Sequence, residues 1–282
     1  MPITSKTHLI GLIGWPVGHS HSPAMHNAAA AALGLDWAYV PLPVRPEALV
    51  SALGGLAALG FRGVNVTVPH KEAVLPYLDA VYPVAQVIGA ANTLVISDGR
   101  LVGFNTDWSG FLSDLEEQGV ALDGRDCLVL GAGGSARAAA YALLRAGGHV
   151  TVLSRRPEQA AELVASFAEA LPGAPLRAGE LGAAAELAAA ADVPVIVNAT
   201  PLGMAGANAG LSPWPDGAPL PPGAFVYDLI YNPPRTPLLA QAEAAGLRYA
   251  NGLGMLVNQA AEAFELWTNR RPDRDVMRRA IE

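Results

Sequence analysis

The stretch from Asp126 to Ala136 (DCLVLGAGGSA) constrains the fold of this chain most strongly. An apolar run ends there in a cluster of small residues, and an Ala-rich segment, Ala138 to Ala146, follows directly. This order predicts a strand, a tight turn and a helix, and the spacing Gly131-x-Gly133-x-x-Ala136 fits a dinucleotide-binding turn. The free N–H groups at the start of such a helix face the phosphates. Gly-rich turns also close strand–helix units that bind nothing, so the pattern alone leaves both interpretations open.

The next predicted strand favours NADP as the dinucleotide. His149–Ser154 is apolar and β-branched, and Arg155 and Arg156 follow it with no acid at the strand tip. NAD sites usually carry Asp or Glu there to bind the ribose 2′-hydroxyl. The planar fork of Arg instead binds phosphate oxygens in pairs. The alternative is a pair of solvated surface arginines, but the turn at the expected distance upstream favours a 2′-phosphate site.

Composition excludes several classes of protein. The chain has 282 residues, 51% hydrophobic and 15% charged, with a net charge of −7 and scattered Lys and Arg, which argues against a nucleic-acid partner. Its single cysteine, Cys127, lies in a predicted strand and is expected in the core. The sequence shows no signal peptide, no apolar segment long enough to span a bilayer and no zinc pattern. We therefore expect a cytoplasmic protein without membrane or metal partners.

Strand and helix patterns alternate along the chain and predict an α/β fold. In the first part, which ends near Thr106, we expect strands at His8–Ile13, Ala38–Leu42 and Gly63–Val68, helices at Pro23–Leu33 and Pro46–Leu59, and a hairpin turn at Asp98-Gly99. The second part holds the dinucleotide turn, later strands at Val193–Val197 and Phe225–Leu229, and a Gly- and Pro-rich surface loop at Ala205–Gly223. The last part, from Gly252, is mainly helical.

Polar residues follow the first predicted strand, at a position where open α/β sheets bind ligands. Ser20 and Ser22 could bind a small anion such as a carboxylate. Ser22 precedes Pro23, however, and Ser before such a proline is also a typical helix cap. The sequence leaves both roles open.

A second cluster lies at the end of the third predicted strand. Alternation places Asn65 and Thr67 on one face, and Lys71 stands just beyond the strand end. A lysine there could donate a proton to a carbonyl oxygen, although it could also be an ordinary helix-start lysine. Asp107 is a typical helix cap and could also pair with Lys71. Gln259 lies within an apolar helix face and should have a polar partner.

Taken in order, these clusters resemble the shikimate/quinate dehydrogenase family, and within it the shikimate dehydrogenases. The resemblance extends from about residue 11 to 267 and rests on the motifs GWPVGHSHSPAMHN, NVTVPHK, GAANT, GFNTD, LGAGGSARA, NATPLGM, YDLIYNPPRTPLL and NGLGMLVNQAAEAFELW. It implies a substrate-binding domain with a mainly parallel sheet at residues 1–106 and 253–282, and a Rossmann NADP-binding domain at 107–252. The last helix would return to the first domain. The implied reaction is the reversible NADPH-dependent reduction of 3-dehydroshikimate to shikimate, which serves aromatic amino-acid biosynthesis.

The resemblance also implies roles for individual residues. Lys71 and Asp107 would be the catalytic pair. The substrate would be bound, or the catalytic residues oriented, by Ser20, Ser22, Thr67, Asn92, Tyr231 and Gln259. The cofactor would be held by Gly131, Gly133, Gly134, Ser135, Ala136, Ser154, Arg155, Arg156, Leu229, Gly252 and Met255. We expect a monomer or homodimer whose partner is a small molecule.

Three positions depart from the family pattern. The ribose site usually reads Asn-Arg-Thr, whereas this chain has Ser154-Arg155-Arg156, and Leu229 stands where Met is common. The pair Ser20-x-Ser22 is the arrangement that favours shikimate over quinate. A dual-specificity quinate/shikimate dehydrogenase that uses NAD or NADP is the alternative enzyme, and a non-catalytic NADP-binding protein is the alternative from another class.

Overall fold

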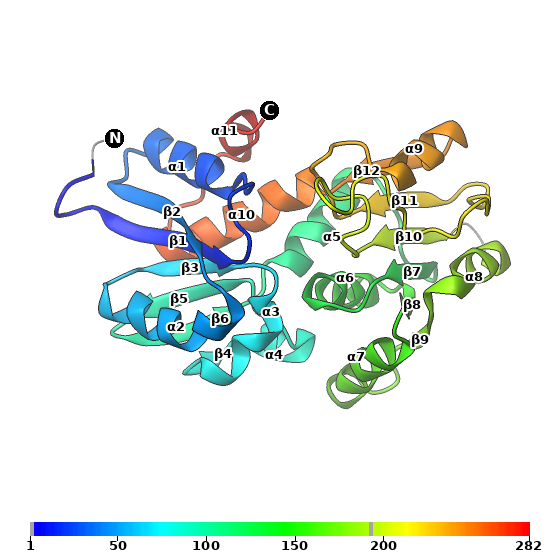
Figure 1. Ribbon diagram of the computed structural model, residues 1–282, viewed down its shortest axis with the longest axis horizontal. Helices are drawn as coiled ribbons and strands as arrows, with labels where there is room; N and C mark the ends of the chain where they lie inside the picture. The colour runs from blue at the N-terminus through cyan, green and yellow to red at the C-terminus, as the bar shows by residue number, and fades with distance from the viewer. Residues whose placement is uncertain (1–2, 192–193) are drawn as a thin grey trace. The chain divides into compact units, whose positions relative to one another are not determined.

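The computed structural model describes residues 3–191 and 194–282, and the chain divides into two compact units. The first unit comprises Met1–Thr106 and Val257–Glu282, and the second comprises Asp107–Leu256. The return to the first unit falls at Val257, inside helix α10 (Leu253–Thr268), whereas the sequence-based boundary lies at Leu253. Each unit has its own sheet (Figure 1). Within the described residues, no helix has the length and apolar character that crossing a membrane requires.

The first unit is built on a mixed sheet with the strand order β2-β1-β3-β5-β6-β4. Strand β1 pairs in parallel with β2 and β3, β4 pairs in parallel with β6, and β5 runs antiparallel to β3 and β6. The strands are β1 (His8–Gly14), β2 (Trp37–Pro43), β3 (Gly63–Val66), β4 (Ala80–Val81), β5 (Thr93–Ser97) and β6 (Arg100–Phe104). In this unit, the α-helices that precede α10 are α1 (Ser22–Ala32), α2 (Leu49–Ala58), α3 (His70–Ala73) and α4 (Pro83–Ile88). Helix α11 (Arg274–Arg279) follows α10.

The local predictions for this unit largely agree with the structure. Asp98 and Gly99 both have positive φ, at 51° and 76°, which confirms the tight hairpin turn between β5 and β6. The predicted helix Pro46–Leu59 instead begins with a separate 3₁₀ turn, Pro46–Ala48, before α2. Strand β3 ends at Val66, earlier than predicted. Helix α10 contributes to this unit through Trp267, whose Nε1 donates to the main-chain oxygen of Leu94 at 2.9 Å.

A fully buried histidine lies among the aromatic side chains of the first unit. The ring of His26 stacks on Tyr39 with centroids 4.3 Å apart, and Trp267 lies at 5.3 Å. Neither ring nitrogen of His26 has a hydrogen-bond partner among the described residues. Burial lowers the pKa of His26 from 6.5 to about 3, and the side chain of Asn65 opposes this shift. The ring is therefore neutral in the folded protein at pH 7.

We expect His26→Phe to flatten the acid side of the stability profile. Between pH 6.5 and about 3 the unfolded chain binds a proton at His26 that the folded chain does not, so stability is lost as pH falls through this window. Removing the group should reduce the slope of unfolding free energy by up to about 1.4 kcal/mol per pH unit. Urea unfolding at a series of pH values measures this slope. Above pH 7 the two profiles should run parallel, and equal slopes at pH 5 would contradict the prediction.

The second unit is built on a parallel sheet with the order β12-β11-β10-β7-β8-β9. This is the doubly wound order of a Rossmann fold: β8 and β9 follow on one side of β7, and β10, β11 and β12 follow on its other side. The point of reversal in the strand order lies between β7 and β10. The strands are β7 (Asp126–Leu130), β8 (His149–Ser154), β9 (Leu176–Glu180), β10 (Val195–Asn198), β11 (Phe225–Asp228) and β12 (Arg248–Asn251). The helices are α5 (Asp107–Glu117), α6 (Gly134–Arg145), α7 (Pro157–Ala170), α8 (Ala184–Ala190) and α9 (Pro237–Ala244).

The segment between β10 and β11 differs from its prediction as a plain surface loop. Trp214 and Leu220 are buried in the core of this unit together with Leu238, and the Trp214 Nε1 donates to the main-chain oxygen of Ala218 at 3.1 Å. The Gly and Pro content of this segment predicts a surface loop and gives no sign that Trp214 and Leu220 are buried. Cys127 is buried in the core, as predicted. Burial raises the pKa of its thiol to about 12. Residue Val193, the predicted start of β10, lies outside the described residues.

Candidate active site

The loop after β1 brings the two predicted anion-binding serines together. Ser20 is half-buried, Ser22 is buried, and the Ser20 Oγ accepts a hydrogen bond from the main-chain N–H of Ser22 at 3.2 Å. Helix α1 begins at Ser22 with His21 at its cap position, and no side chain caps it within the described residues. The interpretation of Ser22 as the helix cap is therefore wrong, because Ser22 already belongs to the first helical turn.

Strand β3 carries polar residues toward the same edge of the sheet. Asn65 is buried, accepts from the Tyr39 hydroxyl at 2.8 Å and donates to the Thr93 hydroxyl at 3.1 Å. Thr67 follows the strand, half-buried, and its N–H donates to the main-chain oxygen of Ile13 at 2.9 Å. The loops after β1 and β3 are thereby held side by side.

Lys71 lies in the short helix α3, half-buried, just beyond the end of β3. Its main-chain oxygen accepts from the N–H of Ala91 at 2.8 Å, which ties α3 to the segment that leads into β5. Asp107 is buried and is the first residue of α5, so it lies inside the helix and not at the predicted cap position before it. Lys71 belongs to the first unit and Asp107 to the second, and each unit is described separately. Their pairing therefore stays a prediction.

Asn92 is the centre of a buried polar network in the first unit. Its Nδ2 donates to the Thr106 hydroxyl at 2.9 Å and to the Gln259 Oε1 at 3.3 Å, and its Oδ1 accepts from the Thr106 N–H at 2.7 Å. All three residues are buried. The network confirms that Gln259, on an apolar helix, has a polar partner. The sequence analysis did not identify Thr106 as a member of this network. Its contact with Asn92 depends on the fold and cannot be inferred from sequence spacing.

The turn after β7 has the geometry that a dinucleotide requires. Gly131 has φ +115°, a conformation that L side chains rarely adopt, and a Cβ there would lie 3.0 Å from the main-chain oxygen of Ala199. Gly133 has open space around its Cβ position. Helix α6 begins at Gly134, directly after this turn, and the start of a helix is where this fold binds the phosphates of a dinucleotide. Ser135 lies in its first turn, and Ala136 is fully buried, which allows close helix–strand packing.

The end of β8 lies on one side of this turn. Ser154 is buried, and its Oγ accepts from the main-chain N–H of Arg156 at 3.3 Å. Arg155 and Arg156 are exposed directly after the strand. The structure thus places both arginines beyond the carboxyl end of the strand next to β7, where the adenosine half of a dinucleotide lies in this fold.

The other predicted cofactor residues lie on the β11 side of the second unit. Gly252 approaches the main-chain oxygen of Leu229 so closely that any Cβ would collide with it, and its N–H donates to the main-chain oxygen of Ile230 at 3.2 Å. Met255 is buried in the first turn of α10, and Tyr231 follows Ile230, half-buried. The structure therefore brings Leu229 and Gly252 together at the carboxyl end of β11.

These features define an α/β protein with a Rossmann-type dinucleotide-binding unit and a second α/β unit with polar residues at its strand ends. Residues 12–94 match the model of the shikimate dehydrogenase substrate binding domain, and residues 252–282 match that of the shikimate 5′-dehydrogenase C-terminal domain. A shikimate dehydrogenase (NADP(+)) from Citrifermentans bemidjiense is 51% identical over 100% of this chain and 97% of its own length. This chain belongs to the shikimate dehydrogenase family.

Solved structures show the same fold over nearly the whole chain. The shikimate 5-dehydrogenase from Thermus thermophilus, in complex with NADP(H) and shikimate, is 42% identical with a TM-score of 0.86 and covers 98% of both chains. A quinate dehydrogenase from Corynebacterium glutamicum, in complex with NAD, is 35% identical with a TM-score of 0.87 and covers 97% of this chain and 98% of its own. The predicted α/β fold with a Rossmann unit is confirmed.

Proposed function

We propose that the chain catalyses the reversible NADPH-dependent reduction of 3-dehydroshikimate to shikimate. The observation that carries this proposal is the dinucleotide turn at the carboxyl edge of a parallel sheet, in a chain 51% identical to an NADP-dependent shikimate dehydrogenase. The first unit supplies a separate set of polar side chains, including Asn92 and Gln259, that suits a small polyhydroxylated acid. The regulatory alternative has less support, because binding alone does not require Lys71 and Asp107.

The residues of the second unit fit NADP. The start of α6 and the open space beside Gly133 suit a pyrophosphate, since a Cβ at Gly133 would have no neighbour within 4 Å. Arg155 and Arg156 suit a 2′-phosphate, with Ser154 orienting the backbone beneath them. The nicotinamide would lie beside Leu229, Gly252 and Met255. When bound, NADPH supplies the hydride.

The substrate would be held mainly by the first unit. We assign its carboxylate to the hydroxyls of Ser20 and Ser22, with Tyr231 contributing from the second unit. Thr67, Asn92 and Gln259 would bind ring hydroxyls or orient the catalytic residues. For Asn92 the orienting role has more support, because its amide is already bonded to Thr106 and Gln259.

Lys71 would act as the proton donor. Negative charge builds on the carbonyl oxygen of the substrate during reduction, and a nearby ammonium stabilises this charge and delivers a proton. Asp107 would hold the lysine and a neighbouring substrate hydroxyl, because a half-buried cation needs a carboxylate or other polar partner. The reverse reaction uses the same groups in the opposite protonation sequence.

A second candidate is a dual-specificity quinate/shikimate dehydrogenase. It is favoured by the likeness to a quinate dehydrogenase solved with NAD and by the unusual Ser154-Arg155-Arg156 sequence. The pair Ser20-x-Ser22 supports shikimate instead. We also expect the chain to act in the cytoplasm, as a monomer or homodimer.

An oxidation assay on the purified protein tests the proposal. Shikimate and quinate are each offered with NADP and with NAD, and the reduced nicotinamide is followed by absorbance. We expect turnover with shikimate and NADP to exceed every other combination. Comparable turnover with quinate or NAD would support the dual-specificity enzyme, and NADP binding without turnover would support a regulatory protein.

An Arg155→Ala, Arg156→Ala double variant serves as the matched control in this assay. Loss of both cations should raise KM for NADP and leave KM for NAD nearly unchanged, because only NADP carries the 2′-phosphate. Equal changes with the two cofactors would exclude these arginines as the basis of cofactor selection.

A further inference from the structure

Asp228, at the carboxyl end of β11, is a fully buried carboxylate that lies outside the predicted site. Its Oδ1 accepts from the Asn198 Nδ2 at 2.9 Å and from the main-chain N–H of Ile230 at 3.0 Å. Its Oδ2 accepts from the Thr236 hydroxyl at 2.7 Å. These donors come from three different segments: the end of β10, the loop after β11 and the start of α9. One carboxylate therefore joins three segments that converge at this edge of the sheet.

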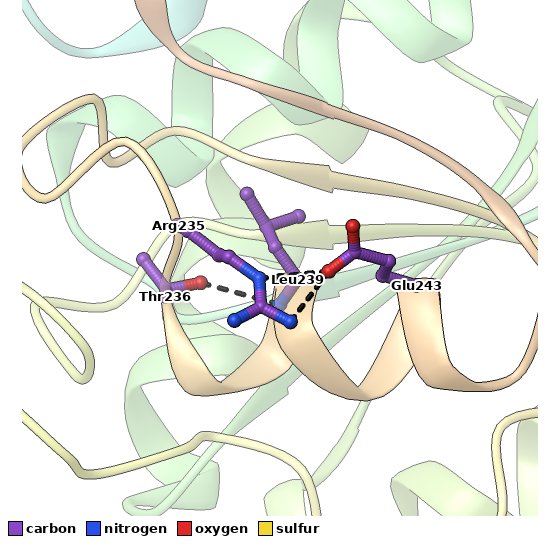
Figure 2. A network of polar contacts seen from close by, with 4 residues as sticks. All are labelled: Arg235, Thr236, Leu239 and Glu243. Atoms are coloured by element: carbon purple, nitrogen blue, oxygen red, sulfur yellow. Dashed lines mark hydrogen bonds and ion pairs between the residues drawn. The ribbon is translucent and has the colours of Figure 1, made fainter.

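Each of these donors holds its own segment in place. The Asn198 Oδ1 accepts from the N–H of Thr200 at 2.9 Å and from its hydroxyl at 2.7 Å, which shapes the turn after β10. The Ile230 N–H bond fixes the backbone between Leu229 and Tyr231. Thr236 is the N-cap of α9, where its Oγ1 accepts from the N–H of Leu239 at 3.3 Å (Figure 2).

The strand order shows which part of a dinucleotide this edge faces. The turn at Gly131 follows β7, the adenosine side lies at β8, and β10 and β11 lie on the opposite side of β7. A dinucleotide bound across the point of reversal would therefore place its nicotinamide half at the ends of β10 and β11. Asp228 itself is fully buried, so it cannot contact the dinucleotide or the substrate.

We propose that Asp228 is a positioning residue for the reaction, because its carboxylate fixes the segment Leu229–Tyr231 and the turn after β10 where the nicotinamide would lie. This inference rests on the proposed function. Burying a carboxylate in an apolar surrounding is unfavourable, and burial raises the pKa of Asp228 to about 6, against the effect of its hydrogen bonds. A carboxylate nevertheless suits this position, since it accepts from several donors at once and an amide side chain would direct its own N–H groups at one of them.

Asp228→Asn tests this role with two ligands that differ in the nicotinamide. The fragment 2′,5′-ADP lacks the nicotinamide and would contact only the turn after β7 and the arginines after β8. We expect its Kd to stay within about twofold of wild type, while the Kd of NADP rises about fivefold, as for the loss of one hydrogen bond. We expect kcat per 2′,5′-ADP-binding molecule to fall about tenfold or more, because small displacements of reacting groups are costly.

A merely structural role would give a different pattern. It would lower the melting temperature and the fraction of protein that binds 2′,5′-ADP, but not kcat per binding molecule. An unchanged kcat, or an equal loss of affinity for 2′,5′-ADP and NADP, would overturn the inference. If the wild-type protein shows no shikimate oxidation, the proposed function fails and this inference fails with it. A wild-type protein that is active beside an unchanged variant refutes the inference alone.

A pair of Thr236 variants carries the test if Asp228→Asn does not fold. Thr236→Ser keeps the hydroxyl that donates to Asp228, whereas Thr236→Val removes it in a side chain of the same shape. We expect kcat close to wild type for the first and several-fold lower for the second, and equal kcat values would overturn the inference. Arg235→Gln is the control, because it removes only the exposed ion pair between Arg235, which precedes α9, and Glu243 of α9 (Figure 2).

Discussion

Lys71→Ala should lower kcat for shikimate oxidation by about 10²- to 10⁴-fold, with much less change in KM for shikimate. The reason is that the ammonium acts on charge that develops only as the carbonyl oxygen gains or loses its proton. An interaction made mainly in the transition state reduces turnover when it is lost, and leaves ground-state binding largely intact. Steady-state kinetics at saturating NADP measures both constants.

The chain offers a natural control for this experiment, because Lys6 is its only other lysine. Lys6 is exposed near the N-terminus, so Lys6→Ala should have wild-type kinetics. Lys71→Met keeps most of the length of the side chain without the charge and should be as impaired as Lys71→Ala. If kcat and KM worsen by similar factors in both Lys71 variants, Lys71 positions the substrate and does not donate the proton.

Much of the fold follows from local patterns that the sequence displays directly. The apolar run before Gly131 and the Ala-rich segment after it predict β7, the turn and α6, because strand, turn and helix each leave a signal within a few residues. The Asp98-Gly99 turn is equally local, since Gly adopts positive φ readily and Asp tolerates it. Such elements are predictable because their determinants are neighbours in the chain.

The polar networks could not be predicted in the same way. Asn92 and Gln259 are hydrogen-bonded although 167 positions separate them, and only the return of α10 to the first unit brings them together. The role of Asp228 could not be predicted either, because its donors come from three segments whose approach depends on the sheet order. Composition also misled between β10 and β11, where a Gly- and Pro-rich segment inserts Trp214 and Leu220 into the core.

Gly133→Asp should greatly weaken NADP binding while leaving the protein at least as stable as wild type. Gly133 is the N-cap of α6 with φ −87° and ψ −175°, a conformation open to any residue, and its Cβ position has no neighbour within 4 Å. Asp is among the preferred N-cap residues, and its charge interacts favourably with the helix N-terminus, so a gain of a few tenths of a kcal/mol is expected. The same carboxylate would occupy the place of the pyrophosphate.

The expected loss of NADP affinity is about 100-fold or more, because opposing two like charges costs several kcal/mol. Fluorescence titration with NADPH and thermal unfolding measure the two effects separately. Gly133→Ser is the matched control: it caps the helix as well as Asp does and adds volume without charge, so its affinity should lie between those of Gly133→Asp and the wild-type protein. A Gly133→Asp protein that is stable and still binds NADPH at wild-type affinity would show that the pyrophosphate does not lie on this turn. A Gly133→Asp protein that is less stable and has also lost NADPH binding would mean that the glycine serves the fold. A binding glycine is distinguished from a structural one because its replacement raises stability while it lowers affinity.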